Sequence, residues 1–130
     1  SEINLSDEDI DKKIRQSVSL ENLIKTYNSY KLYFNTTSHS ALPRGRAEAM
    51  MCGTPIVTTN NYDISDYLVN QKDCILSNDF NVLKKGILDI VNDKDVRKYY
   101  SEAARAAAIK FFHIDDYIKR WREVVEKWNA

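Results

Sequence analysis

The sequence predicts an α/β fold in which a parallel sheet is flanked by helices. Stretches with helical periodicity alternate with short β-branched or aromatic runs, which is the order of elements that produces parallel strands. A length of 130 residues suits one domain, and 43% hydrophobic residues can supply a core. Only three strands are expected, fewer than the usual doubly wound sheet has, so the chain is expected to be part of a longer protein.

The first half of the chain contains two of the three expected strands. Residues 1–16 are polar and acidic and form a separate N-terminal segment, either a loose helix or a tail. Ser19 can cap a helix that ends at Asn28 and Ser29, and the aromatic run 32–34 is the first strand. The elements expected next are a helix over 47–52 that ends at Gly53, a strand over 56–59 and a short helix over 64–69.

The second half is mainly helical after a very short strand expected over 74–76. Asp93 or Asp95 opens a helix that runs to Phe111. Before it, Asp79 caps a helix whose buried face is expected to hold Phe80, Leu83, Ile87, Ile90 and Val91. The periodicity therefore divides the chain into the polar segment 1–16, an α/β domain over 17–112 and an amphipathic helix over 113–130.

Composition and charge exclude several classes of function. Nineteen basic and nineteen acidic residues give zero net charge, which argues against nucleic acid as a general partner. Cys52 and Cys74 form no disulfide framework, and no CxxC pair indicates a metal or redox site. No apolar run is long enough to span a membrane, and the first residues are neither a signal nor a transit peptide. We expect a soluble cytoplasmic domain.

Two loops lie where a parallel sheet binds ligands, outside the carboxyl ends of the strands. Residues 37–46 follow the first strand and residues 60–63 follow the second. Arg44 and Arg46 stand at the start of a helix, where cations oppose the helix dipole, so a bound phosphate would explain them. The alternative is that both arginines are solvated surface residues, and the spacing does not decide between the two.

Glu48 lies on the same short helix, between two alanines and close to two methionines. A carboxylate among apolar residues is either a partly buried charge with a partner or an acceptor for a ligand. Acids in nucleotide sites can accept hydrogen bonds from adjacent ribose hydroxyls. The alternative, which the residues by themselves favour, is a glutamate on the helix surface.

Residues 38–59 resemble the signature of family 4 retaining glycosyltransferases of the GT-B fold. In that family an acid, seven intervening residues and a glutamate precede Ala-Met, and Gly-x-Pro leads into an apolar strand. Glu48-Ala49-Met50 and Gly53-Thr54-Pro55 stand at those places here. The resemblance extends over about residues 17–128. It implies a truncated C-terminal half of such an enzyme, with a Rossmann-like nucleotide-sugar-binding domain over 17–112.

The resemblance also implies a role for individual residues. Glu48 would bind the ribose hydroxyls of the donor nucleotide. Independently of the resemblance, Arg46 and His39 are candidate phosphate contacts, and for His39 the favoured alternative is a surface or packing role. The donor sugar and the pyrophosphate would meet a loop formed by Ser40, Ala41, Leu42, Pro43 and Arg44. Ser40 stands where the family usually has Glu or Asp, and a hydroxyl binds a sugar hydroxyl more weakly than a carboxylate does.

The implied function is transfer of a hexose or N-acetylhexosamine from a UDP- or GDP-sugar to a growing glycan, such as a bacterial surface polysaccharide or lipopolysaccharide. The acceptor, a glycan or lipid-linked glycan, would bind an N-terminal half, and a catalytic Arg and Lys lie upstream in the family, so we expect no activity from this chain by itself. The alternative is a non-catalytic interaction domain that keeps the fold without nucleotide binding; Ser40 is the residue that favours it.

No metal or other cofactor is expected. The pairs Asp7 and Asp9 and Asp93 and Asp95 have the Asp-x-Asp form that some glycosyltransferases use to hold a divalent ion. The first pair lies in a polar tail and the second at a helix start, so solvation and capping explain them better.

The last helix has a continuous stripe of large apolar residues: Ile114, Tyr117, Ile118, Trp121, Val124, Val125 and Trp128. Packing of this stripe against the sheet is the favoured interpretation. Lysines and arginines opposite the stripe leave a second interpretation open, contact with the inner face of a membrane. Self-association through the stripe is a third.

Overall fold

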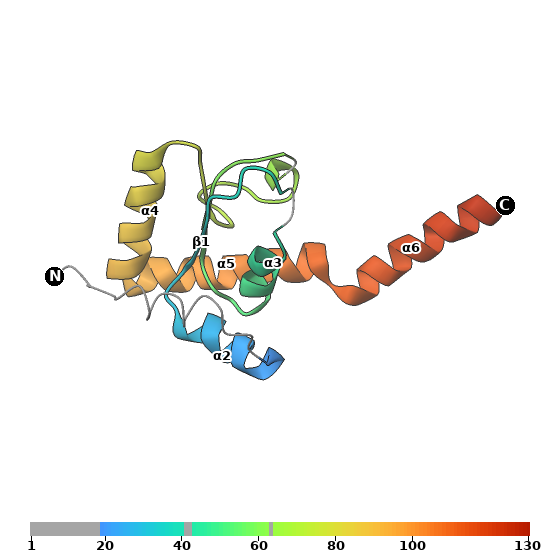
Figure 1. Ribbon diagram of the computed structural model, residues 1–130, viewed down its shortest axis with the longest axis horizontal. Helices are drawn as coiled ribbons and strands as arrows, with labels where there is room; N and C mark the ends of the chain where they lie inside the picture. Colours follow the sequence, from blue (N-terminus) through green and yellow to red (C-terminus); the bar gives the residue numbers. More distant parts are fainter. Residues whose placement is uncertain (1–18, 41–42, 63) are drawn as a thin grey trace, which may run out of the picture.

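The computed structural model describes residues 19–40, 43–62 and 64–130 (Figure 1). The expected polar segment 1–16 lies outside the described residues. The helices are α2 (Leu20–Ser29), α3 (Arg44–Met51), the short 3₁₀ helix η1 (Ile64–Asp66), α4 (Phe80–Asn92), α5 (Lys94–Phe112) and α6 (Ile114–Asn129). The strands β1 (Tyr33–Asn35), β2 (Ile56–Thr58) and β3 (Ile75–Leu76) form a parallel sheet in the order β1-β2-β3. The predicted α/β fold is therefore confirmed.

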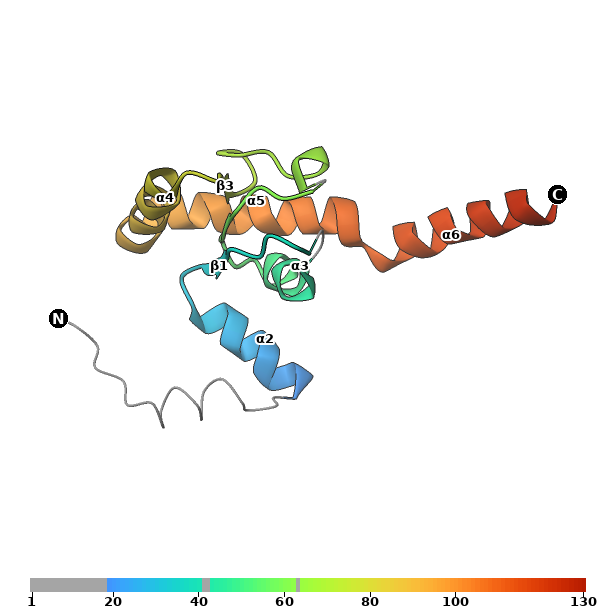
Figure 2. The same cartoon turned by 45° about the horizontal axis from the view of Figure 1, so that its top comes forward.

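The core consists of two clusters, because neighbouring side chains on a strand point to opposite faces of the sheet. On one face, Ile56 and Leu76 pack with α3 and with alanines of α5. On the other face, Val57 and Ile75 pack against α4. α3 and α4 accordingly lie on different sides of the strands (Figure 2), and α5 contributes to both clusters.

The helix that carries most of the predicted site, α3, begins earlier than expected. Pro43 occupies its N-cap position with φ −57°, and Arg44 is its first residue rather than Ala47. A proline is tolerated there because the first N–H groups of a helix have no partner within the helix. The helix ends as expected, with Gly53 in the left-handed conformation at φ +73°.

Other elements also depart from the prediction. β1 starts one residue later, at Tyr33, and η1 is a single 3₁₀ turn instead of a helix over 64–69. Phe80, expected on the buried face of α4, is 73% exposed because it is the first residue of that helix. Ile64 and Leu68, in and just after η1, are buried.

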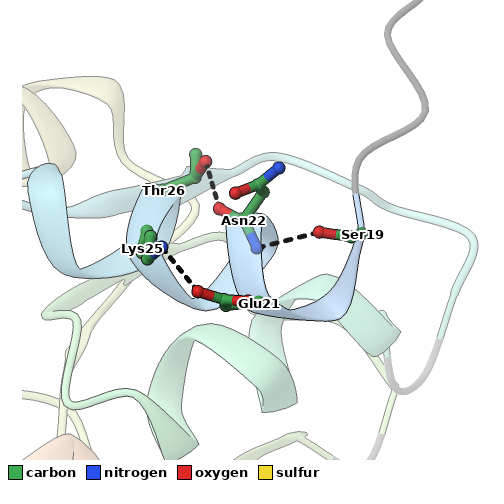
Figure 3. A network of polar contacts seen from close by, with 5 residues as sticks. All are labelled: Ser19, Glu21, Asn22, Lys25 and Thr26. Atoms are coloured by element: carbon green, nitrogen blue, oxygen red, sulfur yellow. Dashed lines mark hydrogen bonds and ion pairs between the residues drawn. The ribbon is translucent and has the colours of Figure 1, made fainter.

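α2 lies on the surface, and local polar contacts support its first turns (Figure 3). Ser19 Oγ accepts a hydrogen bond from the backbone N–H of Asn22 at 3.3 Å. Glu21 and Lys25 form an ion pair of 2.6 Å in the i, i+4 arrangement, and the Thr26 hydroxyl donates to the Asn22 carbonyl at 2.8 Å. The glutamate precedes the lysine, which is the order that the helix dipole favours.

α6 points away from the rest of the chain (Figure 1). His113 has extended backbone angles, interrupts the helix between α5 and α6, and accepts a hydrogen bond from the N–H of Asp115. In the part of the chain that the structure describes, α6 buries none of its side chains, and Trp128 is 88% exposed. The favoured interpretation, packing of the apolar stripe against the sheet, is therefore wrong. The single extended residue His113 does not turn α6 back onto the sheet. None of the helices in the described ranges has the length and apolar character needed to cross a membrane.

Candidate functional site

The two predicted ligand loops lie against each other at the carboxyl ends of β1 and β2. The side-chain amide of Asn61 donates to the backbone carbonyls of Thr37 and Ser40, to the latter at 3.0 Å. Asn61 is 9% exposed, so water competes little for these bonds. Thr37 is also fixed from its own strand, because its N–H donates to Asn35 Oδ1 at 2.9 Å. The loop after β1 is thus held against the loop after β2.

Glu48 projects from α3 and has a partner on each carboxylate oxygen. Arg44 Nε donates to Oε1 at 2.7 Å, and the Tyr27 hydroxyl donates to Oε2 at 3.3 Å. The Glu48 side chain is 31% exposed, whereas that of Arg44 is 93% exposed. Glu48 is therefore a partly buried carboxylate with a partner, the interpretation that the residues by themselves did not favour, and it remains accessible to a ligand.

The Arg44–Glu48 ion pair has the less favourable order for a helix. The cation lies in the first turn and the carboxylate four residues later, so both oppose the helix dipole. The Glu21–Lys25 pair of α2 has the opposite order. An exposed i, i+4 pair contributes only about 0.3–0.5 kcal/mol, so helix stability is a weak reason for Arg44 at this position.

Tyr27 reaches the site from α2. Its ring meets that of Tyr33 edge-on, with ring centroids 6.2 Å apart, and its backbone carbonyl accepts a hydrogen bond from the Thr54 hydroxyl at 3.1 Å. Burial, followed by the neighbouring Glu48 carboxylate, raises the pKa of Tyr27 to about 12. The hydroxyl, which any tyrosine keeps protonated at neutral pH, serves as a donor to Glu48.

A groove of about 580 Å³ lies beside this carboxylate, between α2, α3 and the end of α5. Tyr27 and Glu48 both line it, and much of the remaining wall is apolar. The apolar residues on the wall include Leu20, Leu23, Ile24, Met51 and Phe112. An apolar wall lowers the local dielectric constant and strengthens the hydrogen bonds made by the carboxylate.

Arg46 differs from Arg44 in being enclosed in the protein, with 0% of its surface exposed. Its guanidinium donates to the Thr58 hydroxyl at 3.4 Å and to the Tyr67 hydroxyl at 3.5 Å. Burial lowers the pKa of Arg46, and Tyr67 opposes this change. The side chain thus links α3 to the carboxyl end of β2 and to the segment after η1.

Residues 9–107 match the family model described as Glycosyl transferases group 1. The chain belongs to this family. No curated protein matches it significantly.

The fold of this group 1 chain is also similar to that of a solved structure. The TarM protein of S. aureus, crystallised as a mutant with Fondaparinux, alpha-GlcNAc-glycerol and UDP, matches with a TM-score of 0.70 and 21% sequence identity. The match covers 88% of the present chain and 24% of the TarM chain. The three-stranded sheet and its helices therefore correspond to part of a GT-B glycosyltransferase, which confirms the predicted fold class.

The structure describes all but two of the predicted site residues of this glycosyltransferase-family chain. Ser40, half-buried, and Pro43 lie in the loop and at the N-cap of α3, and Arg44 and Glu48 meet on α3 itself. His39 is exposed at the loop surface, and Arg46 is enclosed. Ala41 and Leu42 lie outside the described residues. The roles suggested for all of these residues stay predictions.

Sequence reasoning missed Tyr27 as a member of the site and missed the enclosed position of Arg46. Arg46 shares a helix face with Ala49 and Met50, at spacings of three and four, and both of these are buried. This spacing is the signal in the sequence from which the buried position of Arg46 could have been predicted. For Tyr27, no local pattern indicated that its hydroxyl meets a carboxylate 21 positions later.

The Asp-x-Asp pairs were considered as metal sites. Asp93 caps α5 by accepting from the N–H groups of Asp95 and Val96, as the capping interpretation predicted. Asp7 and Asp9 lie outside the described residues. Within residues 19–40, 43–62 and 64–130, no group of three or more His, Cys, Asp and Glu side chains is arranged to hold a metal ion.

Proposed function

We propose that this chain is the donor-binding part of a retaining glycosyltransferase of family 4. It would bind a UDP- or GDP-sugar from which a hexose or N-acetylhexosamine is transferred to a growing glycan. Family membership and the GT-B fold support the reaction class, and the presence of UDP in the TarM structure supports a nucleotide sugar as donor. The observation that carries the proposal for this chain is the partly exposed Glu48 carboxylate on α3, one turn after the start of that helix.

The chemistry of this carboxylate suits a ribose. An ionised carboxylate offers about four acceptor positions, and Arg44 and Tyr27 use two of them. Two positions then remain for the adjacent 2′- and 3′-hydroxyls of a nucleotide. These are charge-assisted hydrogen bonds, which are stronger than bonds between neutral groups.

The diphosphate would lie at the N-terminus of α3. Pro43 carries no side-chain acceptor that could cap this helix, so the N–H groups and the dipole of its first turn favour an anion. Arg44 is exposed at the same end and adds a positive charge. Fixed donors and charges of this kind stabilise the departing diphosphate without a metal ion.

Calorimetric titration of UDP and GDP tests the ribose assignment. We expect one of the two nucleotides to bind the protein, and the Glu48→Ala variant to bind it at least about 10-fold more weakly, because two hydrogen bonds to a charged acceptor are lost. Glu21→Ala is the matched control, since Glu21 also forms an i, i+4 ion pair, on the exposed helix α2 (Figure 3). Equal affinity of the parent and Glu48→Ala would contradict the assignment.

The rest of the reaction is assigned to parts of the protein beyond this chain. A glycan or lipid-linked glycan acceptor would bind an N-terminal domain, in the synthesis of a bacterial surface polysaccharide at the cytoplasmic face of the membrane. The 130-residue chain is expected to transfer no sugar by itself. Measurable transfer from a UDP- or GDP-sugar by the chain alone would contradict this expectation.

A second candidate function is a non-catalytic domain that keeps the fold. The observation that favours it is Ser40, which stands where the family usually has an acid. The same titration separates the two candidates, because a domain that has lost its chemistry would bind neither UDP nor GDP.

A further inference from the structure

We propose that Tyr27 is a positioning residue for nucleotide binding: its hydroxyl, together with Arg44, orients the Glu48 carboxylate so that its remaining acceptor positions face the ribose diol. This inference rests on the proposed function of Glu48. It assigns a role to α2, a helix outside the loop and helix that carry the predicted site residues.

The contacts divide the carboxylate between two donors. Arg44 Nε meets Oε1 at 2.7 Å and the Tyr27 hydroxyl meets Oε2 at 3.3 Å. One donor on each oxygen fixes the rotation of the carboxylate plane, which a single donor would leave variable. A fixed plane holds the two unused acceptor positions in place for a diol. The entropic cost of ordering them is then met when the chain folds and does not weaken nucleotide binding.

The two donors differ in how firmly they are held. The Arg44 side chain is 93% exposed, so solvent and salt weaken its hold on the carboxylate. Tyr27 is half-buried, with its ring against Tyr33 and its backbone carbonyl bonded to the Thr54 hydroxyl at 3.1 Å. Tyr27 is therefore the more rigid of the two donors.

The first turn of α3 leaves room for this arrangement. A Cβ atom added to Gly45 would lie 2.8 Å from the Tyr33 hydroxyl and 3.4 Å from the Tyr27 hydroxyl. A glycine here allows both tyrosines to approach α3 closely.

The test compares Tyr27→Phe with the parent in titrations of UDP and of a UDP analogue that lacks both ribose hydroxyls; GDP and its analogue replace them if GDP is the nucleotide bound. Phenylalanine keeps the ring and removes only the donor. We expect Tyr27→Phe to weaken UDP binding by about 3- to 10-fold, the range for one hydrogen bond. It should leave the affinity for the analogue unchanged, and it should have no further effect in a Glu48→Ala background. Tyr30→Phe is the matched control, because Tyr30 is 65% exposed.

The outcomes separate this inference from the proposed function. If Glu48→Ala weakens UDP binding and Tyr27→Phe does not, the ribose assignment stands and the role of Tyr27 is refuted. A loss of affinity for UDP and the analogue alike in Tyr27→Phe also refutes it, since that pattern indicates general damage to the fold. If Glu48→Ala binds UDP as well as the parent, both ideas fail together.

Discussion

At the scale of the residue, the half-buried position of the Tyr27 hydroxyl beside Glu48 affects both the stability of the fold and the orientation of the carboxylate. The hydroxyl lies in a half-buried position against a carboxylate, which makes ionisation costly and keeps the donor proton in place. The residue therefore contributes to the stability of the fold as well as to the orientation of Glu48. The stability contribution depends on pH in a way that can be measured without a nucleotide.

We expect the free energy of unfolding to fall as the pH rises from 10 to about 12. In this range Tyr27 ionises in the unfolded chain, where its pKa is near 10, but stays protonated in the folded protein. The Tyr27→Phe variant lacks this contribution, so its stability should fall less over the same range. Urea unfolding at several alkaline pH values measures the difference. Cys74, whose pKa burial also raises to about 12, is present in both proteins and does not affect the comparison. Parallel pH profiles would contradict the assigned environment of Tyr27.

Individual residues show which parts of the site could be predicted from the sequence and which could not. Glu48, Arg44 and the loop were predictable because they lie within one short stretch whose spacing carries the chemistry. Tyr27 and Arg46 were not placed correctly in the site, since their partners Glu48 and Tyr67 are each 21 positions away and depend on how separate elements pack.

At the scale of the element, α4 lies unusually close to β3. A Cβ atom added to Gly86 would lie 2.7 Å from Ile75 Cγ2 and 2.9 Å from Ile75 Cγ1. Such distances require a shift of the strand or the helix, and both are part of the same buried cluster. The glycine at this position is explained by the close approach of the two elements.

Overpacking a core usually costs about 1–3 kcal/mol, and alanine in a helix regains about 1 kcal/mol relative to glycine. Gly86→Ala is therefore expected to destabilise the fold by up to about 2 kcal/mol. Denaturant unfolding of Gly86→Ala, Ile75→Ala and the double variant tests the cause. Since Ile75→Ala removes both clashing atoms, the double variant should be more stable than the sum of the single effects indicates. Additive effects would show that the contact with Ile75 is not the reason for the glycine.

Element boundaries were harder to predict than the elements themselves. The helix over α4 and the three strands were each expected, because apolar periodicity and β-branched runs are local signals. The start of α3 at Arg44 depended on Pro43 acting as the N-cap, and the exposure of Phe80 depended on where α4 first meets the sheet. These details arise from packing geometry and not from the pattern of residue types.

At the scale of the whole molecule, the two core clusters hold the three strands so that their carboxyl ends meet at one edge. This edge carries the loop after β1, which leads into α3. Arg44 and Glu48 then meet through their i, i+4 spacing on that helix. The sequence did not decide what the stripe of α6 contacts, because a stripe of apolar residues indicates a contact but not its partner. Contact of this stripe with a membrane or with a second copy stays a prediction.

The most direct test of the proposed nucleotide site is a crystal structure of the protein with UDP or GDP bound. The account predicts that both ribose hydroxyls lie about 2.5–3.0 Å from the Glu48 carboxylate, with Tyr27 and Arg44 still donating to it and the diphosphate at the N-terminus of α3. A nucleotide whose ribose is bound away from Glu48 would contradict the central claim.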